Sequence, residues 1–420
     1  MTTTTDQNNG STGGLSLREA ILAANNNTNN DYVILLQSGL RYFLSINGND
    51  AVGAVGDLDI VGGSNVSIRT TGTPSATING AGLTQRDQVL GIAPGATVRL
   101  ENIVVTGGLR GIDNEGDLTI VNGGVTNNGG NISGGGIYNQ GTTRLINTTV
   151  SGNATNFSGG GGIYNGGSLE IVNSTINNNS SSFANGGGIY NRGSLEIVNS
   201  TINNNSSGDL GGGIYLWASG RGNLVNTTIS GNSSNSGGGI YSNPFTAVTI
   251  FLNNVTVANN RANSDGGGIY NDANLGVYYL TNTLIAGNTI GSSTSNDVVG
   301  NFFGDSYNLI GNTTGSTGFG GTDLVNVDAR LGPLQNNGGP TFTHALLAGS
   351  PAINGGNNLI LSEDTFDLDG DGIPNEPLPF DQRGLARISG SAVDIGAFEV
   401  QTTSPLPTIT LALSLSLIHI

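Results

Sequence analysis

The sequence predicts an all-β protein folded as a right-handed parallel β-helix, and three observations lead to this fold class. A GGIY-like string recurs at steps of 25 to 29 residues, each repeat contains short runs of alternating apolar residues, and Gly and Asn separate those runs. A fixed period of this kind indicates a stacked repeat architecture, and short alternating runs rich in Ile, Val and Thr are typical of strands. Three short strands per repeat without hairpin signals predict one β-helix coil per repeat, and the general rule for parallel crossovers favours the right-handed form.

Two residue types mark every repeat. The isoleucine of the repeat stands at Ile112, Ile137, Ile163, Ile189, Ile214, Ile240 and Ile269. The first asparagine column comprises Asn147, Asn173, Asn199, Asn226, Asn254 and Asn282, and the second, six residues later each time, comprises Asn153, Asn179, Asn205, Asn232, Asn260 and Asn288. We expect both asparagine columns to turn inward and to bond their amides along the stack, because an unpaired buried amide costs about 1–3 kcal/mol.

The first element along the chain is a short helix that caps the open first coil. Ser16 followed by Glu19 forms a capping-box pattern, which predicts a helix over about residues 15–25. Its apolar face comprises Leu17, Ala20, Ile21 and Ala24. The cap and the first irregular coils together span residues 1–84, and such a cap covers an edge that would otherwise invite aggregation.

The remaining chain divides into three parts. Residues 85–310 carry the regular coils, of which we expect nine to ten in all, and residues 311–400 form a C-terminal loop-rich β domain. Residues 401–420 begin as a linker and end in LALSLSLIHI, which is too short for a transmembrane helix. We interpret this end as truncated or artefactual, with an anchor lost, and the start MTTTTDQNNG shows no signal-peptide pattern.

Composition excludes several functional classes. The chain of 420 residues has 71 Gly and no Cys, and all 13 of its basic residues are Arg. Without thiols or lysines it has no disulfide scaffold, no thiolate zinc site, no Cys nucleophile and no lysine base. The net charge of −16 also argues against nucleic acid as a partner, since phosphate binding needs a basic surface.

Several motifs carry a resemblance to a known group of proteins. They are the GGGIYN and NSTISGN-like repeats, SLREAI at residues 16–21, the LGPLQNNGGPTFTHALLAGSPAINGG segment at 331–356, DQRG at 381–384 and VDIGAFE at 393–399. The chain resembles β-helix bacterial surface proteins with polymorphic outer-membrane-protein-like repeats, a CSLREA motif and a choice-of-anchor Q domain, within the pectate-lyase-like superfamily. The likeness covers residues 10–400, although Leu15 stands where the motif has Cys. It implies an exported protein, extracellular or on the cell surface and associated with the outer membrane.

The strongest local motif is DLDGDGIPNE, which matches the start of a calcium-binding loop. The predicted ligands are Asp367, Asp369, Asp371, the carbonyl of Ile373, and Asn375. Position 12 of the loop is Leu378 in place of the usual Glu, and the carboxylates that could complete the shell are Glu376, Glu363, Asp364 and Asp381. We predict a Ca²⁺ site here, with a solvated acidic turn as the alternative.

A tyrosine follows the inward isoleucine in six repeats, so a column of tyrosines should face outward and stack. Its members are Tyr138, Tyr164, Tyr190, Tyr215, Tyr241 and Tyr270. The column is either a ligand-contact ladder that holds sugar rings or a self-stacking ladder that stabilises the coils. A second outward column, of ordinary β-sheet threonines, comprises Thr149, Thr175, Thr201, Thr228 and Thr256.

These observations favour a non-catalytic surface protein, adhesin-like or structural in the envelope, whose partners are glycans, cell-surface or matrix ligands. The alternative is a carbohydrate-active enzyme, a polysaccharide lyase or hydrolase. Such enzymes use paired carboxylates across a groove, or calcium-binding Asp with a Lys or Arg base. This chain has no Lys, no adjacent Asp pair and scattered Arg, so we assign no catalytic residue. For His344, the one histidine outside the tail, we expect a structural role.

Overall fold

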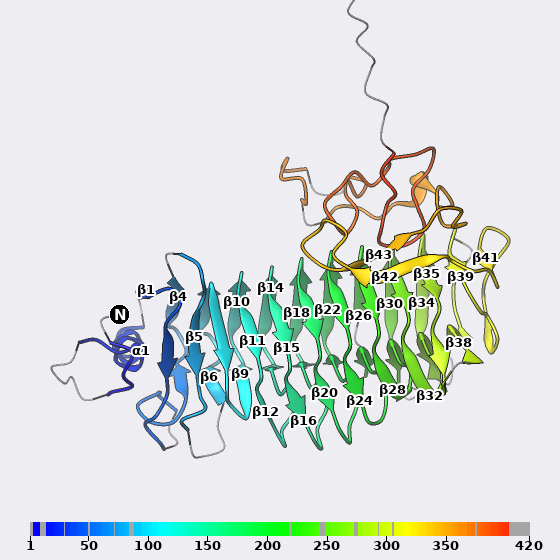
Figure 1. The fold of residues 1–420 in the computed structure, drawn as a ribbon. Coiled ribbons are helices and arrows are strands. Elements are labelled where there is room, and N and C mark those ends of the chain that lie inside the picture. The colour runs from blue at the N-terminus through cyan, green and yellow to red at the C-terminus, as the bar shows by residue number, and fades with distance from the viewer. Residues whose placement is uncertain are drawn as a thin grey trace, which may run out of the picture.

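The computed structural model is a right-handed parallel β-helix, as the sequence predicts, with the coils stacked along one axis (Figure 1). It describes residues 3–8, 14–28, 30–48, 51–70, 72–83, 88–217, 221–243, 248–272, 276–292, 294–304, 306–365, 367–373 and 376–402. Asn375 and all but the first two residues of the predicted 401–420 tail therefore lie outside the described residues.

The N-terminal helix α1 (Leu17–Asn25) lies at the first end of the stack. Both hydrogen bonds of the predicted capping box are present, from the Glu19 amide to the Ser16 hydroxyl and from the Ser16 amide to the Glu19 carboxylate. The apolar face that the sequence indicated is buried and joins the core of the coils. Arg18 is buried too, and its guanidinium pairs with Asp6 at 2.7 Å and donates to the carbonyls of residues 53, 56 and 57. The helix thus covers the open edge of the first coil, as expected.

The middle coils pass through four sheets, which we call C, A, B and D in chain order, whereas the described strands before residue 129 belong to sheets A, B and C alone. The strand pairs of these sheets are parallel, except that Thr289–Ile290 pairs antiparallel with Thr294–Ser295. Sheet A comprises β1 (Asp31–Leu36), β4 (Asn65–Thr70), β7 (Thr97–Glu101), β10 (Asp117–Val121), β14 (Thr142–Ile146), β18 (Ser168–Val172), β22 (Ser194–Val198), β26 (Arg221–Val225), β30 (Thr249–Asn253) and β34 (Val277–Thr281). Sheet B comprises β2 (Arg41–Phe43), β5 (Ala76–Asn79), β8 (Ile103–Thr106), β11 (Gly124–Thr126), β15 (Thr149–Ser151), β19 (Thr175–Asn177), β23 (Thr201–Asn203), β27 (Thr228–Ser230), β31 (Thr256–Ala258), β35 (Leu284–Ala286), β39 (Leu309–Ile310) and β41 (Leu324–Val325).

Sheet C comprises β3 (Leu58–Ile60), β6 (Gln88–Ile92), β9 (Arg110–Asn114), β13 (Ile137–Asn139), β17 (Ile163–Asn165), β21 (Ile189–Asn191), β25 (Ile214–Leu216), β29 (Ile240–Ser242), β33 (Ile269–Asn271), β38 (Val298–Asn301) and β40 (Ser316–Thr317). Sheet D comprises β12 (Gly129–Gly130), β16 (Ala154–Thr155), β20 (Ser180–Ser181), β24 (Ser206–Ser207), β28 (Ser233–Ser236), β32 (Arg261–Asp265), β36 (Thr289–Ile290) and β37 (Thr294–Ser295). Sheet D was not expected, because we predicted three strands per coil. Its strands are mostly two to four residues long, which is too short to show a hydrophobic period.

The core is a stack of identical apolar layers. Leu169 pairs in register with Leu195, and Ile171 pairs with Ile197. All four side chains are at most 1% exposed, and burying one such side chain contributes about 1.5–3 kcal/mol. Gly186 makes the corner before sheet C with φ +71°, where a Cβ would stand 2.7 Å from a backbone carbonyl oxygen. The register of the repeats therefore follows from core packing and from glycine corners.

The second asparagine column forms the buried amide ladder that we predicted. In a typical step, the backbone amide and the Nδ2 of Asn179 both donate to the Oδ1 of Asn205, at 3.0 Å each. The Nδ2 of Asn179 also donates to the carbonyl of Val150 in the preceding coil. A further inward column that we did not predict lies at the end of sheet C, where Asn139 donates to Asn165 at 2.7 Å. The two ladders thus bond buried amides to one another from coil to coil.

For the first asparagine column, the prediction of an inward orientation was wrong. These residues sit at the corner between sheets A and B with positive φ values of 46° to 53°. Asn147 there is exposed, and its Nδ2 donates to Asn122 along the outside of the stack. Asparagine is selected at this corner because it tolerates the left-handed backbone conformation, and the inward bonds are made instead by a Ser/Thr column that includes Ser174 and Ser200.

An aspartate ends the amide ladder. Asn288 is the last asparagine of the column, and its backbone amide and Nδ2 both donate to Oδ1 of Asp297 at 2.8 Å. Asp297 is fully buried, and this burial raises the pKa of its carboxyl from 3.8 to about 6 against the hydrogen bonds from Asn288. The folded state thus holds this proton more tightly than the unfolded chain, so the stability it contributes is present below about pH 4 and is lost as the pH rises through 6.

We therefore expect Asp297→Asn, which cannot ionise, to gain stability relative to the wild type as the pH rises from 4 to 7. The gain should be about 3 kcal/mol, since each pKa unit corresponds to about 1.4 kcal/mol. Denaturant unfolding of both proteins across this pH range measures the difference, in which the other titrating groups cancel. A difference that stays constant with pH would contradict the assignment.

The C-terminal region folds back along the outer face of sheet B, above the coils in Figure 1. Coil strands continue in register to β41, beyond the expected boundary at residue 310, and an antiparallel pair of β42 (Leu331–Gln335) and β43 (Thr343–Leu346) follows. A 3₁₀ turn at Asn358–Ile360 is the other regular element described there. Because this region lies on sheet B, Thr201, Thr228 and Thr256 are buried while Thr149 remains exposed. On the neighbouring sheet A, the same region covers Val198 and Val225 at the ends of β22 and β26.

Candidate functional site

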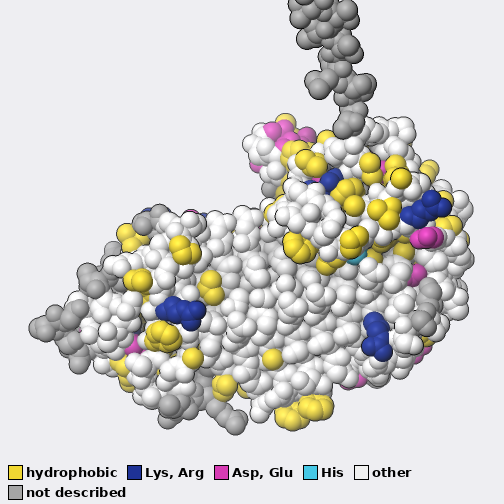
Figure 2. All heavy atoms as spheres, in the orientation of Figure 1, with side chains coloured by type: hydrophobic (Ala, Val, Ile, Leu, Met, Phe, Trp, Pro, Cys, Tyr) yellow, Lys and Arg dark blue, Asp and Glu magenta, His cyan; other side chains and the backbone are white. Residues whose placement is uncertain are grey.

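The acidic loop around residues 364–376 belongs to the C-terminal region and is anchored beside sheet A. Leu378 is 2% exposed and packs with Leu368 against Val198 and Val225, at the ends of β22 and β26. Leu378 is therefore a core residue of this junction, which explains why position 12 of the loop carries no carboxylate. Figure 2 shows acidic side chains gathered at the outer end of the C-terminal region.

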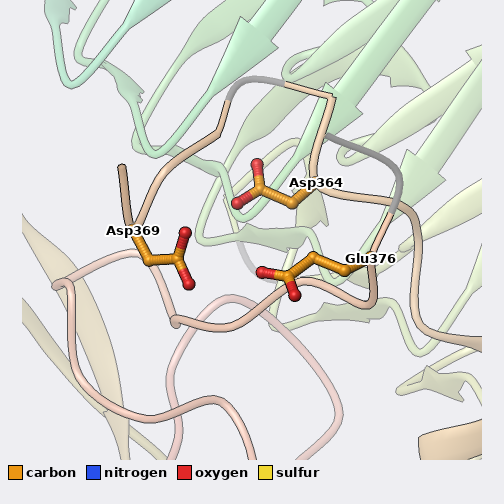
Figure 3. Close-up of side chains that lie close together, drawn as sticks. All are labelled: Asp364, Asp369 and Glu376. Carbon is orange, nitrogen blue, oxygen red and sulfur yellow. The ribbon is translucent and has the colours of Figure 1, made fainter. Parts of the chain in front are cut away.

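Two overlapping groups of carboxylates meet in this loop. Asp367, Asp369 and Asp371 have oxygens within 4.8 Å of one another, as do Asp364, Asp369 and Glu376. Figure 3 shows the second group turning its carboxylates toward one common space. Asp364 is buried, whereas Asp369 is exposed and belongs to both groups. Sequence reasoning therefore brought the three aspartates together correctly, and it named Asp364 and Glu376 among the residues that could complete the shell.

The other residues of the predicted metal site have different places. Ile373 is 58% exposed, and its backbone amide donates to Oδ1 of Asp371. Glu363 is exposed and outside both groups, and Asp381 is buried elsewhere against Arg383, 2.6 Å away. Partial burial, together with the charges of Asp369 and Asp371, raises the pKa of Glu376. Converging carboxylate oxygens that repel one another are the donor set that a hard divalent cation binds.

The tyrosine column faces outward from sheet C and stacks. Ring centroids lie 4.9 Å apart for Tyr138–Tyr164, 5.0 Å for Tyr164–Tyr190 and 5.5 Å for Tyr215–Tyr241. Tyr215 and Tyr241 are buried, and the Tyr215 hydroxyl accepts a hydrogen bond from Asn243 at 2.7 Å. Tyr270 meets Tyr241 edge-on at 5.4 Å. Since the ring faces cover one another, this geometry favours a ladder that stabilises the coils, and a ligand role for it stays a prediction.

A polar groove of about 620 Å³ lies on the outer face of sheet A, beside the acidic loop. Its lining includes Arg144, Glu170, Glu196, Arg221, Asn223 and Thr365. The first five come from four successive strands, β14, β18, β22 and β26, so the groove runs along the stack. Thr365 follows Asp364 directly, so the acidic loop contributes one wall.

The carboxylates in the groove already have partners. Arg144 pairs with Glu170, with Nε 2.7 Å from Oε1, and Asn223 donates to Glu196 at 3.1 Å. Burial raises the pKa of Glu170, while Arg144 opposes this shift and Glu196 adds to it. The sequence did not indicate the groove, because one of its walls comes from Thr365, which is far from these strands in the sequence. The signal that could have found it is the shared outward register of four consecutive coils.

His344 has the structural role that we expected. It is 1% exposed, its Nε2 lies 2.9 Å from the Ser230 hydroxyl and its Nδ1 lies 2.7 Å from the Gly332 carbonyl. Burial lowers the pKa of its imidazole. The ring links β43 to β27 across the interface with sheet B.

Comparison with known proteins places the fold. No protein-family model and no curated protein matches the chain. Among solved structures, the chain is similar to pectate lyase Pel9A, with a TM-score of 0.51 and 16% sequence identity over 94% of both chains. The protein is thus a β-helix protein with the pectate-lyase-like fold. Of the helices that the structure describes, none has the length and apolar character needed to cross a membrane.

Proposed function

We propose that this protein is a non-catalytic, exported bacterial surface protein, adhesin-like or an envelope spacer, that binds glycans on the outside of its coils. The observation that carries this proposal is the sheet A groove, in which arginine, glutamate and asparagine side chains are already paired with one another. Polar side chains held in such pairs still offer hydrogen bonds to the hydroxyls of a sugar. A general acid or base, in contrast, must lie within hydrogen-bond reach of the proton that it transfers. The resemblance to CSLREA and choice-of-anchor Q proteins supports the surface location.

A glycan array tests this proposal. The full chain is applied with calcium and with chelator, and bound glycans are then incubated with the protein and checked for cleavage. We expect binding to a defined subset of glycans and no new reducing ends or unsaturated products. The absence of binding to any glycan in both conditions would overturn the proposal, and so would turnover.

A carbohydrate-active enzyme is the second candidate, and one specific observation favours it. Glu170 and Glu196 are in-register neighbours on β18 and β22, so their side chains start about 4.8 Å apart. Retaining glycosidases hold their two carboxyl groups about 5–5.5 Å apart, and their acid has a raised pKa, as Glu170 does. Pel9A, a structural neighbour of this chain, is a pectate lyase. Turnover of any polysaccharide that is lost in Glu170→Gln would select this candidate.

The surface protein is further proposed to be stabilised by calcium bound at the acidic loop, through Asp364, Asp369 and Glu376 or through Asp367, Asp369 and Asp371. Calcium at 100 times its dissociation constant should then stabilise the fold by about 2.7 kcal/mol. Asp369→Asn should abolish this effect, because both groups use Asp369.

Thermal unfolding with millimolar calcium or with chelator measures the effect. Glu363→Gln is the matched control, because Glu363 is an exposed carboxylate of the same region outside both groups. It should keep the full calcium response. A wild-type protein indifferent to calcium, or an Asp369→Asn variant that responds fully, would show that the loop is only a solvated acidic turn.

A further inference from the structure

We infer that the outer face of sheet A binds a neutral oligosaccharide along the axis of the coils, in the groove of Arg144, Glu170, Glu196, Arg221, Asn223 and Thr365 and on the aromatic stack beyond it. This inference rests on the proposed function and names the site and the ligand class. It differs from the tyrosine ladder, which lies on sheet C.

One outward register position joins the groove to an aromatic stack. Asn223 pairs in register with Phe251, Phe251 with Tyr279, and Tyr279 bridges to Phe303. The ring centroids lie 5.1 Å apart for Phe251–Tyr279 and 5.5 Å apart for Tyr279–Phe303, and both pairs are stacked. The side chains of Tyr279 and Phe303 are 42% and 59% exposed. The Arg221 guanidinium lies 5.1 Å from the Phe251 ring centroid and so bridges the two parts.

The groove and the aromatic stack together form one strip of outward side chains, with one register position in each coil. From Glu170 to Phe303 it contains six successive register positions, which at about 4.8 Å per coil extend over about 24 Å. The polar half offers guanidinium and amide donors with carboxylate acceptors, and Ser194 adds a hydroxyl to the groove. The aromatic half offers apolar ring edges and the tip of Tyr279. A chain of sugar rings presents hydroxyls and C–H surfaces at a similar repeat, so it can use both halves at once.

Charge selects a neutral ligand. The groove holds two arginines and two glutamates, and Arg144 is already paired with Glu170. The acidic loop lines the groove with the uncharged Thr365, and the whole chain carries a net charge of −16. A polyanion such as polygalacturonate would be repelled by the net negative charge of the chain, because the two arginines of the groove are matched by its two glutamates.

The test is isothermal titration of the full chain with cellohexaose, xylohexaose, mannohexaose and maltohexaose, and with hexagalacturonate as the charged probe. We expect one or more of the neutral hexasaccharides to bind, with the dissociation constant raised at least tenfold by Arg221→Ala and by Asn223→Ala. Phe303→Ala should weaken the hexasaccharide and leave the corresponding trisaccharide unchanged, because a trisaccharide in the groove does not reach Phe303. Melting temperatures verify that each variant is folded.

Two control variants separate the site from the proposed function. Arg99→Ala removes an exposed arginine of sheet A outside the groove, and Tyr190→Ser interrupts the tyrosine ladder; both should bind like the wild type. Loss of binding in Tyr190→Ser alone would overturn this site and leave the proposed function intact. Tighter binding of hexagalacturonate, unchanged binding in Arg221→Ala and Asn223→Ala, or no binding of any neutral hexasaccharide would also overturn the site. Cleavage of a bound hexasaccharide would instead overturn the proposed function.

Discussion

Asn205→Ala is expected to lower the free energy of unfolding by about 3–5 kcal/mol, because it interrupts the buried amide ladder at mid-stack. Oδ1 of Asn205 accepts the backbone amide and the Nδ2 of Asn179, and its own Nδ2 donates to the carbonyl of Ile176 and to Asn232. Alanine removes the shared acceptor of the Asn179 backbone amide and Nδ2, of which Nδ2 keeps only its bond to the Val150 carbonyl, and it removes the side-chain donor to the Ile176 carbonyl, all in a buried stack. Each such buried group costs about 1–3 kcal/mol.

Chemical denaturation monitored by circular dichroism measures this loss. The matched control is Asn235→Ala on β28, whose exposed side chain should be replaceable within about 0.5 kcal/mol. If Asn205→Ala were no more damaging than Asn235→Ala, the amide ladder would not hold the coils together, and the stability would have to come from apolar stacking alone.

Gln382→Ala is expected to release the C-terminal region from sheet B, with a loss of about 3 kcal/mol. Gln382 is fully buried. Its Oε1 accepts from the Thr228 hydroxyl at 2.6 Å, and its Nε2 lies 2.9 Å from the Thr201 hydroxyl and 3.1 Å from the Ser200 carbonyl. One side chain therefore satisfies polar groups of two coils, and its removal leaves them facing a cavity at the interface.

Hydrogen exchange measures this release locally. In Gln382→Ala the amides of residues 329–402 should exchange faster, while those of β14 to β22 keep their protection. Gln335→Ala, an exposed glutamine on β42, is the control and should change neither set. Uniform loss of protection along all coils in Gln382→Ala would mean that the C-terminal region is an integral part of the helix stack and not a separately docked cover.

The coil stack could be predicted from sequence because every step of it is local and repeated. The spacing of the isoleucines gives the length of one coil. The alternation in runs such as the one containing Leu169 and Ile171 indicates which side chains point inward, and the glycine corner indicates where the chain turns. The N-terminal helix was equally accessible, since its capping box is a four-residue pattern. The wrong orientation of the Asn147 column has a clear cause: asparagine serves both as a buried amide and as a left-handed corner residue, and spacing alone does not distinguish the two.

The candidate site could be predicted only in part, because it combines distant segments. The aspartates of the acidic loop are close in sequence and were grouped correctly. The position of that loop over sheet A, however, depends on the packing of Leu378 on Val198, and nothing in the sequence near residue 378 indicates this contact. The groove needs Arg144, Arg221 and Thr365 together, which come from three parts of the chain. The burial of Thr228 under Gln382 is likewise a long-range event that periodicity does not reveal.

In this groove, a binding protein and an enzyme would differ only in what the same two glutamates do. Glu170 and Glu196 have the chemistry of a catalytic pair, yet Arg144 neutralises the first and Asn223 engages the second. An ion pair of this partly exposed kind is worth only about 0–1 kcal/mol, so a bound sugar could displace it. Whether the glutamates then transfer a proton or only accept hydrogen bonds is the question that separates the two candidate functions.

Mass spectrometry of oligosaccharides incubated with the full chain answers that question most directly. The neutral hexasaccharide that binds most tightly, and hexagalacturonate, are incubated with the protein and calcium for a day near neutral pH, with Glu170→Gln as the parallel sample. We predict that every hexasaccharide keeps its mass while titration shows binding in the groove. Shorter fragments, or products with the mass of an unsaturated sugar, that form with the wild type and not with Glu170→Gln would contradict the proposal of a non-catalytic surface protein.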